Sequence, residues 1–227
     1  MTNRREHIAS SLAEVESKIG AAVKASHRSR ESVVLIAVTK TYPASDVEIL
    51  RDLGVTDFGE NRDSEGSEKS SLVQGRWHFQ GQLQSNKIAS ITGWADVIHS
   101  LDTSKHVDRL DKSVPEGKKL SVFLQVGLDQ SPGRGGIEPS ELLGLADQVE
   151  VCEHLELMGL MAVAPLGENP ESAFARLAVI HTSFLAHHPQ ATALSAGMSG
   201  DFEIAIAYGA THIRVGSSIL GSRISPL

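Results

Sequence analysis

Apolar residues recur along the chain with two spacings, one typical of helices and the other of buried strands. Near the N-terminus, apolar residues three or four positions apart predict a helix with one apolar face: Ile8, Leu12, Val15, Ile19 and Val23. The uninterrupted apolar run from Val33 to Val38 is typical of a strand buried on both faces in a parallel sheet. Beyond it, strand-like and helix-like segments alternate to the C-terminus. The expected strand segments cover residues 33–39, 55–61, 76–80, 96–100, 120–126, 155–163, 192–195 and 211–215.

Eight strands that alternate with helices, after one additional N-terminal helix, match an α/β fold of the (β/α)8 TIM barrel type in number and length. A doubly wound open sheet is the alternative. The first strand, however, is not followed by the glycine-rich turn that binds dinucleotides in such sheets. No stretch rich in proline, glycine or serine divides the chain, so we expect a single domain over residues 1–227.

Composition and charge exclude several classes of partner. The chain has a formal net charge of -7 and a pI near 5.8, which argues against nucleic acid or an anionic membrane as a partner. No apolar run reaches the ~20 residues of a membrane span, and no secretory signal is evident. Cys152 is the only cysteine, so we expect a cytoplasmic protein without disulfides. The histidines show no metal-binding spacing, and we expect no metal site.

Lys40 is the first candidate for chemistry, because it stands where the apolar strand from Val33 ends. Desolvation at such a position disfavours the charged ammonium and lowers the pKa of a lysine. A lysine that is partly neutral can attack an aldehyde and form an imine. From this stretch alone, a lysine that ends the strand and points to water is the simpler interpretation.

Other polar residues are expected at the same end of the barrel. In TIM barrels the active site lies at the C-terminal ends of the strands, and Lys40, Asn61, His78, His99 and Arg214 fall at or near such ends. We therefore expect them to be neighbours in space. For His78 two interpretations stay open, a residue beneath a bound ligand or a hydrogen-bonded core histidine.

Two late turns form a candidate phosphate site. Each is rich in glycine and serine and begins a helix, and helix N-termini attract anions through free N–H groups and the helix dipole. Barrels of this type often bind phosphate between the loops that follow the last two strands. The alternative is that the serines are plain helix caps and the glycines plain turn residues. The candidate residues are Ser195, Met198, Ser199, Gly216 and Ser217.

A lysine able to form an imine, next to a phosphate site, points to pyridoxal 5′-phosphate (PLP) as cofactor. Arg214 lies two residues before Gly216 and is expected to face the same pocket. If it meets the pyridine nitrogen, a permanent cation donates there and keeps the ring unprotonated. The alternative for Arg214 is a salt bridge to a carboxylate of the barrel.

Seven short segments in order resemble the pyridoxal phosphate homeostasis proteins, and together they cover nearly the whole chain. They are Ala37–Lys40, Phe58–Asn61, Trp77–Gly81, Leu83–Lys87, Gly159–Met161, Leu194–Ser199 and Ile213–Ser217. The resemblance implies a monomeric barrel similar to the N-terminal domain of alanine racemase, with the cofactor on Lys40 and Asn61 close to it. It also implies Arg214 at the ring nitrogen. The implied phosphate contacts are Ser195, Ser199, Gly216 and Ser217.

The sequence departs from this family at three places, at one of which Gly127 stands where an asparagine is common. Gln80 stands where the family usually has an aliphatic residue. Arg134 stands in a loop where the family usually has a lysine. A guanidinium can hold a phosphate but does not readily form an imine, so a second cofactor-holding role of that loop stays open.

Two function hypotheses follow. The resemblance implies a carrier that handles and buffers PLP, holds it as an imine on Lys40 and delivers it to apo-PLP enzymes. The alternative is an amino-acid racemase or a related PLP enzyme. Racemisation by two bases requires an acid/base on each face of the substrate, and the only tyrosines are Tyr42 and Tyr208. We therefore favour the carrier without dedicated turnover. A phosphosugar-binding barrel would explain the phosphate site but leave Lys40 unused.

Overall fold

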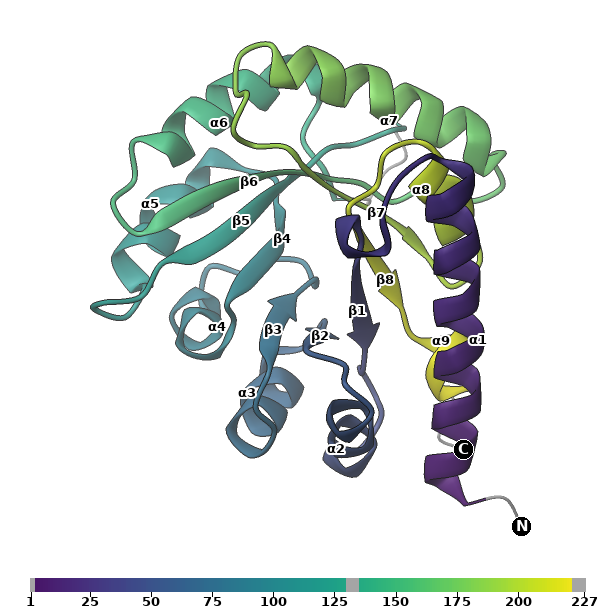
Figure 1. The fold of residues 1–227 in the computed structure, drawn as a ribbon. Helices are drawn as coiled ribbons and strands as arrows, with labels where there is room; N and C mark the ends of the chain where they lie inside the picture. The colour runs from purple at the N-terminus through teal and green to yellow at the C-terminus, as the bar shows by residue number, and fades with distance from the viewer. Residues whose placement is uncertain (1–2, 130–134, 222–227) are drawn as a thin grey trace.

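The computed structural model describes residues 3–129 and 135–221, in which the strands form one closed barrel. Eight parallel strands pair in chain order, and the last pairs with the first (Figure 1). They are β1 (Val34–Val38), β2 (Asp57–Glu60), β3 (Arg76–Phe79), β4 (Val97–Leu101), β5 (Leu120–Gln125), β6 (Leu155–Met161), β7 (Ala193–Met198) and β8 (His212–Val215). The predicted (β/α)8 barrel is confirmed.

The helices surround the strands (Figure 1). They are α1 (Arg4–Ala25), α2 (Ala44–Asp52), α3 (Asp63–Leu72), α4 (Ile88–Trp94), α5 (Ser104–Ser113), α6 (Leu142–Glu150), α7 (Pro170–Leu185), α8 (Phe202–Ala207) and α9 (Ser217–Leu220). Two 3-10 turns, η1 (Arg30–Ser32) and η2 (Pro139–Glu141), complete them. None of the helices in the described part of the chain combines the length and apolarity that crossing a membrane requires.

The predicted N-terminal helix is α1, and its predicted apolar face is the buried one. The buried residues of α1 are Ile8, Leu12, Val15, Ile19 and Val23. This face packs against α8 and α9, so α1 covers the barrel near the strands that close it (Figure 1). Asn3 and Glu6 form a capping box at the start of the helix, which satisfies backbone N–H groups that an uncapped helix leaves unpaired.

Strand β7 is longer than the sequence pattern predicted, and this changes the position of the serine in it. The expected strand ended at Ser195, whereas β7 continues to Met198. The extension contains a bulge, because the pairing with β8 shifts register between these two residues and Gly197 has φ +90°. A Cβ at Gly197 would lie 2.7 Å from the Cβ of Ala205, so only glycine fits there. Ser195 therefore lies within the barrel wall and not in a turn.

The interior of the barrel is partly polar. Val97, Phe123, Met161 and Ala193 form a small apolar cluster separate from the main core. His99 is fully buried beside this cluster, and its ring stacks on Phe123 with the centroids 4.5 Å apart. A buried imidazole is tolerated only when its nitrogens are hydrogen-bonded.

A buried ion pair joins α3 to the ends of β1 and β2. Lys69 Nζ lies 2.6 Å from Glu60 Oε1 and donates to the carbonyl oxygen of Thr39 at 2.9 Å. The hydroxyl of Thr39 donates to the same Glu60 oxygen at 2.6 Å. Burial raises the pKa of Glu60, while the hydrogen bonds from Lys69 and Thr39 oppose that rise. These three residues fix the strand end that carries Lys40.

We expect Lys69→Met to destabilise the protein by about 3–5 kcal/mol, because it leaves the buried Glu60 carboxylate without its cation. The measurement is the free energy of unfolding in urea. The double variant Glu60→Gln/Lys69→Met removes both charges and should recover a large part of the loss. A double variant as unstable as Lys69→Met alone would show that packing of the lysine stem, and not charge compensation, is what the site needs.

Candidate functional site

A cavity of about 340 Å³ lies at the C-terminal ends of the strands, where TIM barrels carry their active sites. Strands β1, β2, β7 and β8 supply most of its lining, either from their last residues or from the loops that follow. The predicted site residues that line it are Lys40, Asn61, Met198, Ser199, Arg214, Gly216 and Ser217. The structure therefore brings together residues that are up to 177 positions apart in the chain (Lys40 to Ser217, 217 − 40 = 177).

The backbone around Lys40 is held on both sides. Thr39, before it, is buried and bonded to Glu60. Thr41, after it, has φ +72°, a left-handed conformation that is rare for a β-branched residue. The backbone N–H of Thr41 donates to Glu65 Oε2 at 2.7 Å, which holds the turn. Lys40 itself is half-buried and lines the cavity.

Arg214 forms the buried part of the cavity lining. Its Nη1 donates to the hydroxyl of Ser195 at 2.6 Å and its Nη2 donates to the carbonyl of Ala162 at 3.0 Å. Burial lowers the pKa of Arg214 to about 10, and nearby Asp201 opposes the shift, so the guanidinium stays charged at neutral pH. Within the described part of the chain, no carboxylate lies in ion-pair contact with it. The salt-bridge alternative for Arg214 is therefore wrong.

Ser195 is the predicted site residue that the cavity does not include. It is fully buried, and its hydroxyl contacts His99 Nδ1 at 2.8 Å as well as Arg214. With both partners inside the barrel, the hydroxyl supports Arg214 from below. The sequence predicted Ser195 both as the last residue of a strand and as a phosphate contact of the turn that follows; β7 continues to Met198, so Ser195 lies inside the strand.

The two late turns meet through Ser199. Its hydroxyl accepts from the backbone N–H groups of Gly216 at 3.2 Å and of Ser218 at 3.4 Å. In the first turn, the backbone N–H of Met198 donates to Asp201 Oδ1 at 2.6 Å. An anion bound here would therefore compete with an acidic side chain for the N–H of Met198.

Two amide side chains present buried polar atoms without a partner. Asn61 Oδ1 and Gln80 Nε2 both belong to residues that line the cavity, and neither atom has a hydrogen-bond partner within the described residues. One is an acceptor and the other a donor. Gln80 was identified from the sequence only as a departure from the family, although a polar residue directly after β3 was a signal for a site residue. Tyr42 also lines the cavity, and its hydroxyl donates to the carbonyl of Gly221 at 2.6 Å.

His78 is a hydrogen-bonded core histidine and does not line the cavity. It is fully buried, with Nε2 2.9 Å from Asp57 Oδ1 and Nδ1 2.8 Å from His99 Nε2. This settles the alternative that the sequence left open. Arg134 lies outside the described residues, so the expectation for its loop is not addressed by the structure.

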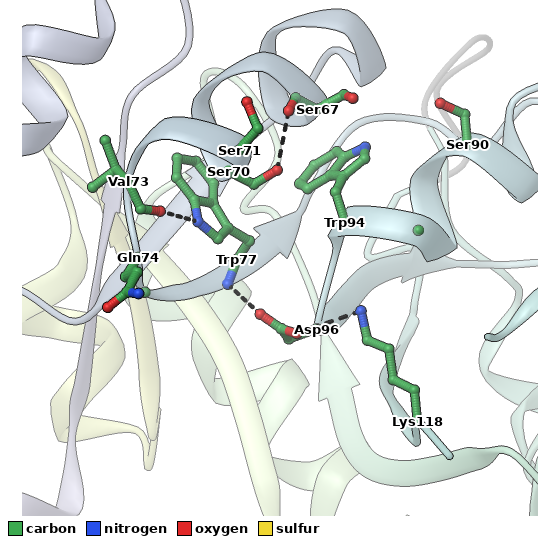
Figure 2. Close-up of a pocket in the computed structure, with 12 residues that line it drawn as sticks. Ser67, Ser70, Ser71, Val73, Gln74, Trp77, Ser90, Trp94, Asp96 and Lys118 are labelled. Atoms are coloured by element: carbon green, nitrogen blue, oxygen red, sulfur yellow. Dashed lines mark hydrogen bonds and ion pairs between the residues drawn. The ribbon is translucent and has the colours of Figure 1, made fainter. Parts of the chain in front are cut away.

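A larger groove of about 670 Å³ lies at the opposite end of the strands, between α3 and α4 (Figure 2). Its polar groups are largely bonded to one another. Trp77 donates through its indole to Val73 O at 3.1 Å and through its backbone to Asp96 at 2.9 Å, and Asp96 lies 3.4 Å from Lys118 (Figure 2). Trp77, Asp96 and Lys118 are thus engaged with one another, and none of the predicted site residues lines this groove.

One cluster of potential metal ligands occurs within residues 3–129 and 135–221: Asp147, Glu150 and His188. Glu150 Oε1 lies 3.0 Å from His188 Nδ1, and Asp147 Oδ1 lies 3.7 Å from His188 Nε2. The carboxylates therefore face different nitrogens of one ring, which is the arrangement of an ion-pair cluster.

Comparison with known proteins agrees with this geometry. The family model for the N-terminal domain of alanine racemase matches residues 10–224. An alanine racemase structure from Corynebacterium glutamicum has a TM-score of 0.68 at 12% identity, over 90% of this chain and 60% of that one. At this identity the likeness shows the fold alone.

Two relatives are similar along almost their whole length. The pyridoxal phosphate homeostasis protein of Mycobacterium leprae is 38% identical, over 96% of this chain and 94% of that protein. The structure of PipY from Synechococcus elongatus with PLP bound has a TM-score of 0.82 at 34% identity, over 94% of this chain and all of that one. The chain belongs to the pyridoxal phosphate homeostasis protein family, whose barrel is that of the alanine racemase N-terminal domain.

Proposed function

We propose that this protein binds PLP covalently through Lys40 and carries and buffers the cofactor, with apo-PLP enzymes as recipients. In this proposal it acts as a monomer in the cytoplasm, as one domain over residues 1–227, and without a dedicated turnover. The observation that carries the proposal is the joint position of Lys40, Arg214 and the turn at Ser199 around one cavity.

The donor set of the cavity fits PLP. The cofactor supplies an aldehyde that condenses with an amine, an electron-withdrawing ring and a phosphate. Lys40 is the amine, and Arg214 is a permanent cation for the ring nitrogen. Asn61 Oδ1 and Gln80 Nε2 are buried polar atoms that still need a partner, and such atoms favour a polar ligand. A Cβ on Gly216 would lie 3.0 Å from the carbonyl oxygen of Val38, so the glycine allows a close approach of backbone at this point.

The relatives support the same cofactor. The protein of Mycobacterium leprae is named for pyridoxal phosphate homeostasis, and PipY has PLP bound. Both names describe those proteins. The inference that this chain also binds PLP depends on the residues that line its own cavity.

The phosphate would lie at the two late turns. Gly216 and Ser217 begin α9, and Ser199 holds this start through its hydroxyl. Asp201 accepts from the N–H of Met198. The phosphate would therefore be bound by neutral N–H and hydroxyl donors, close to an acidic side chain. Such binding is reversible, as a carrier requires, because neutral hydrogen bonds each contribute only ~0.5–1.5 kcal/mol.

A racemase needs a second acid/base opposite the lysine. Tyr42 is the tyrosine that lines the cavity, and its hydroxyl is bonded to the backbone carbonyl of Gly221. Tyr208 follows α8 and is not part of the lining. The carrier is therefore the better supported function.

Lys40→Ala should abolish covalent PLP binding, because the variant lacks the amine that attacks the aldehyde. We expect the purified protein with PLP to show a visible absorbance band, and borohydride to fix the cofactor on Lys40 in a peptide map. The variant should lose the band and keep its circular dichroism. Lys105→Ala, which replaces an exposed lysine on α5, is the control that keeps the band. A band that persists in Lys40→Ala would reject the assignment.

Ser199→Ala should weaken PLP retention by about tenfold or less, since one neutral hydroxyl is lost and 1.4 kcal/mol corresponds to one decade. Equilibrium dialysis gives the dissociation constant of PLP. Ser67→Ala in the groove at the opposite end of the barrel should leave it unchanged. Transfer of PLP to an apo-enzyme should still occur. A loss of several hundredfold would mean that Ser199 does more than order the turn.

With L- or D-alanine, the PLP-loaded protein should racemise no faster than free PLP, because Tyr42, the tyrosine in the cavity lining, is held by the carbonyl of Gly221. Chiral chromatography of the product measures the rate. If the amount of racemised alanine exceeded the amount of protein, and the activity disappeared in Tyr42→Phe while PLP stayed bound, the racemase hypothesis would be favoured instead.

A further inference from the structure

A line of hydrogen bonds crosses the barrel interior and ends at Arg214. It begins at Asp57, the first residue of β2, whose Oδ1 lies 2.9 Å from His78 Nε2. His78 Nδ1 lies 2.8 Å from His99 Nε2, and His99 Nδ1 lies 2.8 Å from the hydroxyl of Ser195. That hydroxyl is the group to which Arg214 donates at 2.6 Å. Strands β2, β3, β4, β7 and β8 each contribute one member, and we call these five residues the relay.

The carboxylate at one end determines the direction of every bond in the relay. Burial tends to raise the pKa of Asp57, but hydrogen bonds from His78 and from Thr56, whose hydroxyl lies 2.6 Å from Oδ2, lower it overall. An ionised carboxylate only accepts, so the proton of His78 is on Nε2. Its Nδ1 must then accept, which places the proton of His99 on Nε2 as well.

The same argument extends to the cation. With its proton on Nε2, His99 accepts through Nδ1 from the hydroxyl of Ser195. The serine oxygen then has its lone pairs free for Arg214, which can only donate. With the opposite tautomer, His99 and Arg214 would both donate to the Ser195 oxygen, and the hydroxyl hydrogen would have no acceptor within the relay. Only the direction set by Asp57 lets every member be satisfied.

Both imidazoles are neutral in this arrangement. Burial lowers the pKa of His78, and Asp57 opposes the shift without reversing it. Burial also lowers the pKa of His99 well below its usual value, and the nearby His78, Arg214 and His212 lower it further. The anion of Asp57 and the cation of Arg214 are thus connected through neutral groups that each donate once and accept once.

We propose that Asp57, His78 and His99 are positioning residues for Arg214. Through Ser195 they hold its guanidinium in one orientation toward the cavity, so that the ring nitrogen of bound PLP always meets a donor. This inference rests on the proposed function, because it takes Arg214 to face the ring. None of these three residues lines the cavity, so any influence they have on the cofactor is transmitted through Ser195 and Arg214.

The first test uses the apo-protein and needs no cofactor. Nitrogen-15 NMR of the imidazole groups at neutral pH should show both His78 and His99 as neutral rings protonated on Nε2, assigned with His78→Gln and His99→Gln. A ring protonated on Nδ1, or on both nitrogens, would contradict the direction of the relay. This result is independent of whether the protein binds PLP.

The second test compares Asp57→Leu with Glu156→Leu, since Glu156 lies near the same end of the barrel, as the second residue of β6, but accepts from Ser121 and contacts no member of the relay. Asp57→Leu should weaken PLP binding by roughly threefold to tenfold, which is the effect of losing about one neutral hydrogen bond that orients Arg214. It should also shift the visible band of bound PLP in the same direction as Arg214→Gln. Glu156→Leu should leave the band in place. A purely structural role of Asp57 would change the unfolding midpoint and leave the band unmoved, which would overturn the proposal.

A double-mutant cycle checks that the effect travels through Arg214. In the Arg214→Gln background, Asp57→Leu should produce no further spectral shift. An equal shift in both backgrounds would overturn the proposal. Where Asp57→Leu does not fold, Asp57→Ala, which also removes the acceptor for His78, takes its place in the cycle with the same two outcomes. Loss of the band in the wild-type protein would instead reject the proposed function, and the tautomers of the apo-protein would still test the relay.

Discussion

The pairing of β8 with β1 is the constraint on which the site depends. It places Ile36 opposite Arg214 and Ala37 opposite Val215, so the residues that follow β1 and β8 emerge side by side. Lys40 and the turn at Gly216 therefore border one cavity although they are far apart in the chain. In an open sheet the first and last strands would be edges, and the amine and the phosphate turn would be separated. Barrel closure thus brings together the segments of the proposed PLP site.

Much of this arrangement could be predicted from the sequence, because the signals are local. The apolar face of α1 follows the helical spacing residue by residue. The uninterrupted apolar run before Lys40 is typical of an interior strand. Once alternating segments indicate a barrel, residues at strand ends are expected to converge. That reasoning places Lys40, Asn61 and Arg214 together without any knowledge of side-chain contacts.

Some residues were misjudged or missed from the sequence because their roles depend on contacts between distant segments, and the spacing of residues along the chain does not reveal such contacts. Ser195 was predicted as the last strand residue and as a phosphate contact of the next turn, but β7 continues through the bulge at Gly197 to Met198, and Ser195 is fully buried. Lys69 sits on a polar helix and gave no sign of burial, because its partner Glu60 comes from another element. Gln80 was noticed only as an unusual residue, and its unpaired amide becomes meaningful when the cavity is known.

The surroundings of Arg214 explain how a buried cation can remain useful. A contacting carboxylate would compensate its charge more directly, but it would occupy the donors that a ligand in the cavity needs. Here the first acceptors are a serine hydroxyl and the carbonyl of Ala162, which are neutral and take only two of the five N–H groups of a guanidinium. The balancing carboxylates are not in contact with the guanidinium: Asp57 is at the far end of the relay, and Asp201 is in the turn after β7, where it accepts from the N–H of Met198. A cation held by neutral acceptors keeps its field directed at the pocket, because no carboxylate among residues 3–129 and 135–221 is in ion-pair contact with it.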